Sequence, residues 1–126
     1  AGGYPILGWK EIREMKEGGI SFGSHTKTHR NLCLLRDDEI LAELKDSKKA
    51  IEDALKIEIS EFAYPFGIFD ERVKRLVRQA GFSCARTILQ AYNTKDTDMY
   101  YLNAVPADLL LSASSFAARC LRINYT

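Results

Sequence analysis

The residues best suited to chemistry gather in one short segment, residues 24–29, with the sequence SHTKTH. This segment contains both histidines of the chain, His25 and His29. Imidazole is a common ligand of divalent metals, and a gap of three residues allows two rings to turn toward one ion. No glutamate follows His25, so the His-Glu-x-x-His pattern of zinc peptidases is absent. The spacing indicates a metal site of another kind, although two ordinary surface or core histidines would show the same spacing.

A second unusual segment is residues 62–67, with the sequence FAYPFG. Aromatic residues around a proline, closed by a glycine, predict a rigid turn at the end of a strand. The rings of Tyr64 and Phe66 could stack on a sugar or shape a groove. The other interpretation is a hydrophobic turn that plugs the end of a barrel.

Three helices are predicted around these segments from apolar residues at helical spacing. The strongest is residues 37–56, with Asp37 or Asp38 as its N-cap. A shorter helix at 9–17 ends at a pair of glycines. Another begins after an Asp70 cap and ends at Gly81.

Strands are predicted between and after these helices, at residues 20–25, 62–64, 82–87 and 100–105. A last helix is predicted at 112–121. The connections are long enough for parallel strands, so the predicted fold class is α/β. The first strand would deliver His25 to the rim where α/β folds place their active sites.

Length, composition and net charge exclude several classes of protein. A chain of 126 residues predicts one domain, residues 1–126, and its 46% apolar content excludes a collagen-like or disordered chain. A net charge of +1 provides no basic surface for nucleic acid, and no apolar run is long enough to span a membrane. Cys33, Cys84 and Cys120 are odd in number and widely spaced, which favours reduced, buried thiols.

Taken together, these segments resemble the polysaccharide deacetylase family, also called the NodB homology domain or carbohydrate esterase family 4. The resemblance covers about residues 8 to 90 and is specific in combination. It is carried by the histidine segment, the FAYPFG segment 33 residues later, and three flanking stretches: WKEI at 9–12, EGGISFG at 17–23, and residues 70–83.

The resemblance implies a distorted (β/α) barrel and a metal-dependent N-deacetylase acting on N-acetylglucosamine polymers. His25 and His29 would be two ligands of a divalent metal, usually zinc, with cobalt or nickel as alternatives. An Asp would be the third ligand. The backbone amide of Phe66 would help to hold the tetrahedral oxyanion, and Tyr64, Pro65 and Phe66 would form part of the polysaccharide groove.

Three family features are missing. The Thr-Phe-Asp-Asp motif, which supplies the base and the acidic ligand, does not occur, and no histidine follows His29 to act as the acid. Ala63 stands where many members carry an arginine. The resemblance therefore implies the C-terminal two-thirds of the domain, without its first strands and inactive by itself. Asp37, Asp38 and Asp70 are better explained as helix caps than as replacement ligands.

Two other functions stay open at this point. The chain could be a non-catalytic module that grips a glycan with its aromatic turn. It could also be an assembly homologue, in which exposed barrel edges pair two copies as a homo-oligomer.

Overall fold

A computed structural model describes residues 5–105 and residue 112, and it has the predicted α/β class. The predicted final helix at 112–121 lies outside the described residues, apart from residue 112. Three α-helices, two strands and two short 3₁₀ helices make up the described part: α1 Trp9–Glu17, η1 Leu32–Leu34, α2 Asp37–Leu55, β1 Glu61–Ala63, η2 Pro65–Gly67, α3 Glu71–Gln79 and β2 Cys84–Arg86.

The three helices predicted within the described residues are confirmed, with one correction. Asp70 caps α3, since its Oδ1 accepts the Val73 amide at 2.7 Å. The N-cap of α2 is Arg36 rather than Asp37 or Asp38, which lie inside the first turn. Their negative charges there still interact favourably with the positive end of the helix dipole. The prediction was therefore one residue late.

Of the four predicted strands, β1 has the predicted length, shifted by one residue, and the other three are shorter than predicted. β1 and β2 pair in parallel, and the predicted strands at 20–25 and 100–105 each contribute a single bridge, Ser24 to Phe62 and Leu102 to Arg86. At 100–105 the reason is a turn, because both the Tyr100 and Tyr101 amides bind Asp98. The described residues therefore contain only a narrow parallel sheet, and the distorted (β/α) barrel stays a prediction.

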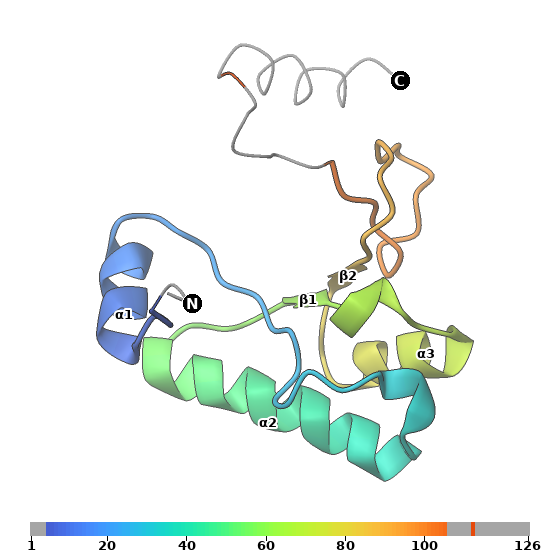
Figure 1. Ribbon diagram of the computed structural model, residues 1–126, viewed down its shortest axis with the longest axis horizontal. Helices are drawn as coiled ribbons and strands as arrows, with labels where there is room; N and C mark the ends of the chain where they lie inside the picture. The colour runs from blue at the N-terminus through green and yellow to red at the C-terminus, as the bar shows by residue number, and fades with distance from the viewer. Residues whose placement is uncertain (1–4, 106–111, 113–126) are drawn as a thin grey trace.

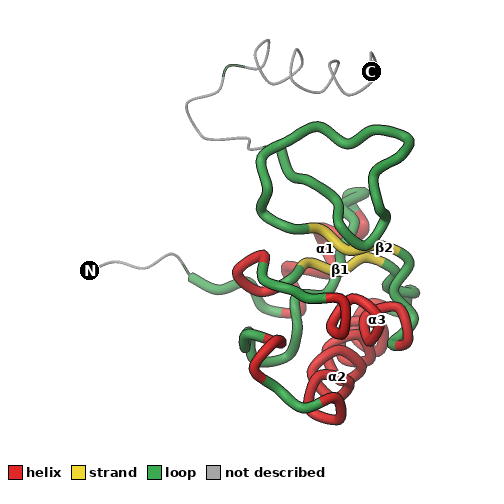
Figure 2. Tube along the Cα trace, turned by 90° about the vertical axis from the view of Figure 1, so that its right-hand side faces the viewer, coloured by secondary structure: helices red, strands yellow, loops and turns green. Residues whose placement is uncertain are grey.

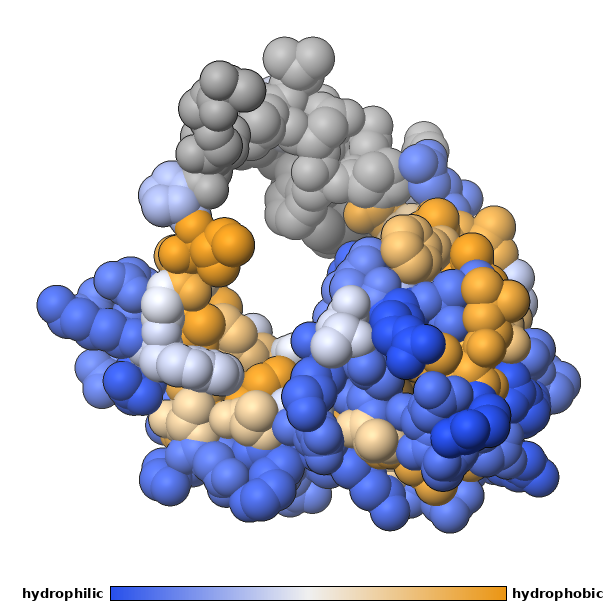
Figure 3. Space-filling model, turned by 60° about the horizontal axis from the view of Figure 1, so that its bottom comes forward, coloured by the Kyte–Doolittle hydropathy of each residue, from blue (hydrophilic) through white to orange (hydrophobic). Residues whose placement is uncertain are grey.

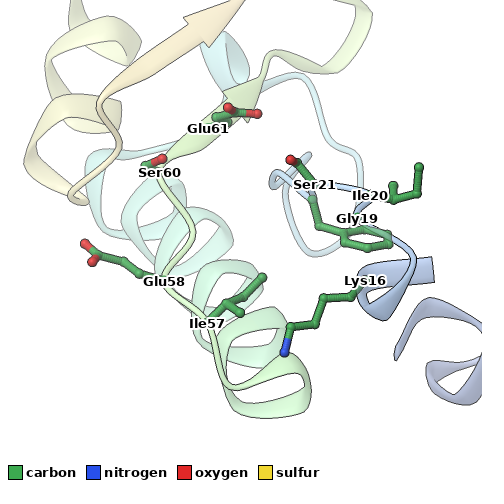
Figure 4. Close-up of a pocket in the computed structure, with 9 residues that line it drawn as sticks. Lys16, Gly19, Ile20, Ser21, Ile57, Glu58, Ser60 and Glu61 are labelled. Atoms are coloured by element: carbon green, nitrogen blue, oxygen red, sulfur yellow. The ribbon is translucent and has the colours of Figure 1, made fainter. Parts of the chain in front are cut away.

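Residues 20–22 fail to pair because they diverge from the chain that leads into β1. The resulting cleft has a volume of about 350 Å³. It lies between Gly19, Ile20 and Ser21 on one side and Ile57, Glu58, Ser60 and Glu61 on the other (Figure 4). The two segments come together at Gly23, where a Cβ would lie 3.0 Å from the Glu61 carbonyl oxygen. Glycine at this position allows the bridge at Ser24 to form.

The sheet has two different faces. α2 and α3 lie together on one side of the strands (Figures 1 and 2). The core on that side contains Phe62, Tyr64 and Ala85 of the strand region, together with helix residues such as Leu44 and Val77. Glu61, Ala63, Cys84 and Arg86 alternate with them and point to the opposite side. That uncovered face carries the chemistry-bearing residues.

Hydrophobic side chains are also exposed. No residue of α1 is buried, and Trp9 and Met15 remain partly open to solvent. A second exposed set lies near the end of β1 and after β2, including Phe66 and Ile88. Figure 3 shows hydrophobic surface at both the left and the right of the molecule. None of the described helices combines the length and the apolar character needed to cross a membrane.

Two of the three cysteines are described, and both are free thiols. Cys33 and Cys84 are half-buried rather than fully buried as predicted. Burial raises the pKa of both thiols, which disfavours the reactive thiolate. Cys120 lies outside the described residues.

Candidate functional site

The two histidines meet at their Nε2 atoms. Nε2 of His25 and Nε2 of His29 lie 3.0 Å apart, and the ring centroids are separated by 4.7 Å. Both side chains are exposed at the C-terminal end of the Ser24–Phe62 bridge. The sequence prediction that the rings turn toward one another therefore agrees with the geometry.

His25 is held in one orientation by the neighbouring strand. Its Nδ1 lies 2.7 Å from the carbonyl oxygen of Ala63, the residue beside it across the bridge. A carbonyl can only accept a hydrogen bond, so Nδ1 must carry the proton, and Nε2 is left with a free lone pair. This backbone contact is the arrangement that orients metal-ligating histidines in proteins. With Nδ1 of His25 protonated, the 3.0 Å contact between the two Nε2 atoms requires His29 to be the hydrogen-bond donor and His25 the acceptor.

A tight loop turns His29 back toward His25. Thr26 and His29 both have left-handed backbone conformations, with φ of 70° and 58°. The His29 amide donates to the Thr26 hydroxyl at 3.0 Å, which closes the turn. Such conformations are uncommon for residues other than glycine, so surrounding contacts must maintain them.

One of those contacts comes from a residue that the sequence analysis did not identify. Glu43 of α2 is only 8% exposed and accepts hydrogen bonds from the loop between the histidines. Burial alone would raise the pKa of Glu43, but hydrogen bonds from the Thr28 hydroxyl and the amides of Thr28 and Lys27 outweigh it, and the pKa lies below its usual value. The available signal was an acidic residue on the apolar face of a predicted helix, three residues after Ile40.

Phe66 places an aromatic ring beside the histidine pair. Its ring centroid lies 4.6 Å from that of His29 in an edge-to-face arrangement, and its side chain is 54% exposed. Phe66 also has a left-handed backbone, with φ of 59°. Among the described residues its amide has no hydrogen-bond partner, so this donor is free to bind a ligand.

Tyr64 and Pro65 are placed differently from Phe66. Tyr64 is 1% exposed, stacks on Phe69, and donates its hydroxyl to the Tyr100 carbonyl at 2.9 Å. Burial raises the pKa of the Tyr64 phenol. Pro65 is also buried. Neither side chain presents a surface for sugar stacking, so their contribution to a groove would be to fix the position of Phe66.

A cavity of about 230 Å³ opens beside His25 on the uncovered face of the sheet. It is lined by Gly23, Glu61, Ala63 and Arg86 in addition to His25. Ala63 lies between His25 and Arg86 in one row across the strands, because Ser24 pairs with Phe62 and Ala63 with Arg86. The small side chain of Ala63 keeps the space between these two larger residues open.

The acidic residues considered as replacement ligands are occupied elsewhere. Asp37 pairs with Arg72 at 2.9 Å, Asp38 pairs with Arg36 at 3.0 Å, and Asp70 caps α3. The described part of the chain contains no group of three or more His, Cys, Asp or Glu residues that could hold a metal. The histidine pair thus fits part of a zinc-type ligand set, two nitrogen donors out of the usual three protein ligands.

Comparison with known proteins relates most of the chain to one family. Residues 2–85 match the family model described as polysaccharide deacetylase. The chain is 28% identical over 109 residues to YxkH of Bacillus subtilis, which covers 86% of this chain and 39% of YxkH. It is 35% identical over 65 residues to chitin deacetylase 1 of Cryptococcus neoformans, covering 52% of this chain and 14% of that protein.

Solved structures give the same picture for the fold. A polysaccharide deacetylase from Bacillus cereus superposes with a TM-score of 0.77 at 28% identity, covering 89% of this chain and 36% of that one. The deacetylase PplD of Streptococcus pyogenes has a TM-score of 0.82 at 24% identity, covering 89% of this chain and 50% of that one. The chain spans half or less of the length of these relatives.

Proposed function

Because this chain belongs to the polysaccharide deacetylase family, we propose that it forms part of a metal-dependent carbohydrate N-deacetylase. The substrate would be the acetamido groups of an N-acetylglucosamine-type polysaccharide, and the reaction would be hydrolysis of the amide bond. The relatives include a chitin deacetylase, which supports this substrate class. The activity belongs to the whole protein, since this chain aligns with half or less of the length of these relatives.

The observation that carries the proposal is the convergence of His25 and His29 at a distance of 3.0 Å between their Nε2 atoms. Nδ1 of His25 faces the Ala63 carbonyl, so the lone pair on Nε2, on the other side of the ring, is directed away from the strand. Nitrogen donors of this kind suit zinc, with cobalt or nickel as alternatives. A divalent metal held here would polarise the amide carbonyl and make the attacking water more acidic.

The chain's own residues would bind and orient the substrate. The free amide of Phe66 would donate a hydrogen bond to the oxyanion, a charge that develops only in the transition state. The exposed ring of Phe66 would lie against a sugar face, while buried Tyr64 and Pro65 hold the turn in place. We place the carboxylate ligand, the general base and the general acid outside the described residues.

We further propose that the fold is part of a distorted (β/α) barrel. The support is the parallel sheet, covered by α2 and α3 on one face and open on the face that carries His25. The structural likeness to the Streptococcus pyogenes and Bacillus cereus proteins supports the same architecture. Further strands would cover the open face and complete the site.

The test is acetate release from chitin oligosaccharides, measured with this chain alone and with any longer polypeptide that contains it. We expect turnover in the longer polypeptide that is lost on chelation, restored by zinc, and abolished by His25→Ala or His29→Ala. Lys27→Ala is the matched control, because Lys27 lies between the histidines and, within the described residues, its side chain pairs only with Asp46 at the surface. Tight glycan binding without acetate release, unaffected by chelation, would instead support the non-catalytic alternative.

A further inference from the structure

We propose that Glu43 is a positioning residue for the histidine pair. Its carboxylate, fixed on α2, maintains the loop conformation that brings His29 against His25. The inference builds on the proposed metal site, but the contacts that carry it exist in the chain without metal.

The first line of evidence is the set of donors that meet at this one carboxylate. Oε2 accepts the amide of Lys27 at 2.9 Å and the amide of Thr28 at 2.8 Å. Oε1 accepts the hydroxyl of Thr28. Glu43 has no ion pair within 4 Å among the described residues, so hydrogen bonds from the loop solvate a carboxylate that is 8% exposed. A buried charge left without such partners would be strongly unfavourable.

The second line of evidence is the backbone strain on either side of these contacts. Thr26 and His29 have left-handed backbones, a conformation that is unfavourable for residues other than glycine. Lys27 and Thr28, the two residues between them, are the ones whose amides Glu43 binds. The carboxylate therefore provides acceptors at the point where the loop departs from regular structure. Strained conformations of this kind persist only where the surroundings determine them.

The third line of evidence is that α2 forms hydrogen bonds with the residue before each histidine. Ser47, one turn after Glu43, forms a hydrogen bond of 2.7 Å between its hydroxyl and that of Ser24. Ser24 directly precedes His25, and Thr28 directly precedes His29. Two residues on one buried helix face thus fix the residue before each imidazole. The helix acts as a rigid base on which the two rings are set relative to each other.

The decisive experiment compares side-chain contacts in the metal-free chain by NMR. In the parent chain we expect a nuclear Overhauser effect between the His25 and His29 rings and slow exchange of the Lys27 and Thr28 amide protons. Glu43→Ala should remove both signals. Glu43→Gln should retain them, because the amide oxygen still accepts the two backbone amides and the Thr28 hydroxyl can accept from the new NH₂ group.

A matched control separates positioning from general stability. Glu52, also on α2, accepts the Ile59 amide at 2.9 Å and pairs with Lys48, at the end of the helix away from the histidines. Glu52→Ala should lower the melting temperature and leave the ring contact unchanged. Thr28→Val provides a second variant at an exposed position should Glu43→Ala fail to fold, and it should weaken the ring contact. A folded Glu43→Ala or Thr28→Val chain with the parental ring contact would overturn the proposal.

Zinc titration of the same variants connects the inference to the proposed site. Outer-shell partners of metal ligands typically change metal affinity by about 10- to 100-fold, and we expect a loss of this size in Glu43→Ala but not in Glu52→Ala. Parental zinc affinity in Glu43→Ala would contradict the proposal. If the complete protein does not bind zinc at all, the proposed metal site is wrong, while the NMR comparison still decides the role of Glu43.

Discussion

The ring of His29 meets the ring of Phe66 edge to face, with 4.6 Å between centroids. This contact joins two segments that the sequence separates by 37 positions: the histidine loop and the turn after β1. It places an exposed aromatic surface, a free backbone amide and two imidazole nitrogens in one small region. The predictions below test the parts of this arrangement separately.

Phe66→Ala should weaken binding of N-acetylglucosamine oligomers. The loss of an exposed ring contact is worth about 0.5–1.5 kcal/mol, several-fold in affinity. The free energy of unfolding should change little, because Phe66 is 54% exposed. Calorimetric titration with chitin oligosaccharides measures the first effect and urea unfolding the second. Ile68→Ala, an exposed apolar residue on the same turn, is the control, and an equal loss of binding there would remove the special role of Phe66.

Zinc should stabilise a chain that contains both histidines. A ligand that binds only the folded state at 100 times its dissociation constant contributes about 2.7 kcal/mol, which calorimetry detects as a higher melting temperature. His25→Ala and His29→Ala should each abolish the shift, and Lys27→Ala should preserve it. A shift that survives removal of either histidine would show that zinc binds elsewhere.

Gly67→Ala should destabilise the turn that carries Phe66. Gly67 has a φ of 67°, and an added Cβ would lie 2.5 Å from a side-chain carbon of Ile88 and 3.0 Å from the Ile88 amide nitrogen. We expect a loss of more than about 1–2 kcal/mol in urea unfolding, the cost of the left-handed conformation alone.

Two further variants separate the two causes at Gly67. Gly19→Ala, at a φ of 91° with no atom within 4 Å of the added Cβ, should show the backbone cost without the clash. The double variant Gly67→Ala with Ile88→Ala should recover part of the loss, because it removes the side-chain clash and keeps the backbone strain. If Gly19→Ala and Gly67→Ala lowered the free energy of unfolding equally, the predicted clash with Ile88 would be wrong.

The stability contributed by Glu43 should depend on pH. Its pKa is lower in the folded chain than in the unfolded chain, because hydrogen bonds from Thr28 and Lys27 outweigh the opposing effect of burial. A lowered pKa means that the contribution is present above the unfolded value, about pH 4.3, and is lost as the pH falls through the folded value.

Urea unfolding at about pH 7 and at pH values below about 4 measures this dependence. Glu43→Gln should change less with pH than the parent chain, because it has no carboxylate to protonate. Glu17→Gln removes the same formal charge from an exposed position and should retain the parental pH dependence. If the free energy of unfolding of Glu43→Gln depended on pH as strongly as that of the parent chain, the Glu43 carboxylate would not contribute to this pH dependence.

The sequence alone was sufficient for the features that depend on local order. Apolar residues at helical spacing located α1, α2 and α3, and the short polar side chain of Asp70 marked the start of α3. Helices could be found in this way because their hydrogen bonds and their periodicity lie within one segment. Three of the four strands were predicted too long, since pairing depends on partners distant in the sequence. The predictions at 20–25 and 100–105 could not anticipate the cleft beside Ile20 or the turn at Asp98.

At the site, the sequence determined which residues are available: two histidines four positions apart and an aromatic turn closed by glycine. Only the tertiary structure decided how they are used. It buried Tyr64, left Phe66 exposed, gave His25 the Ala63 carbonyl, and placed Glu43 beneath the loop. The physical reason is that these contacts join residues 15 to 38 positions apart, and the direction of a side chain across such a gap is set by packing, which no local pattern encodes.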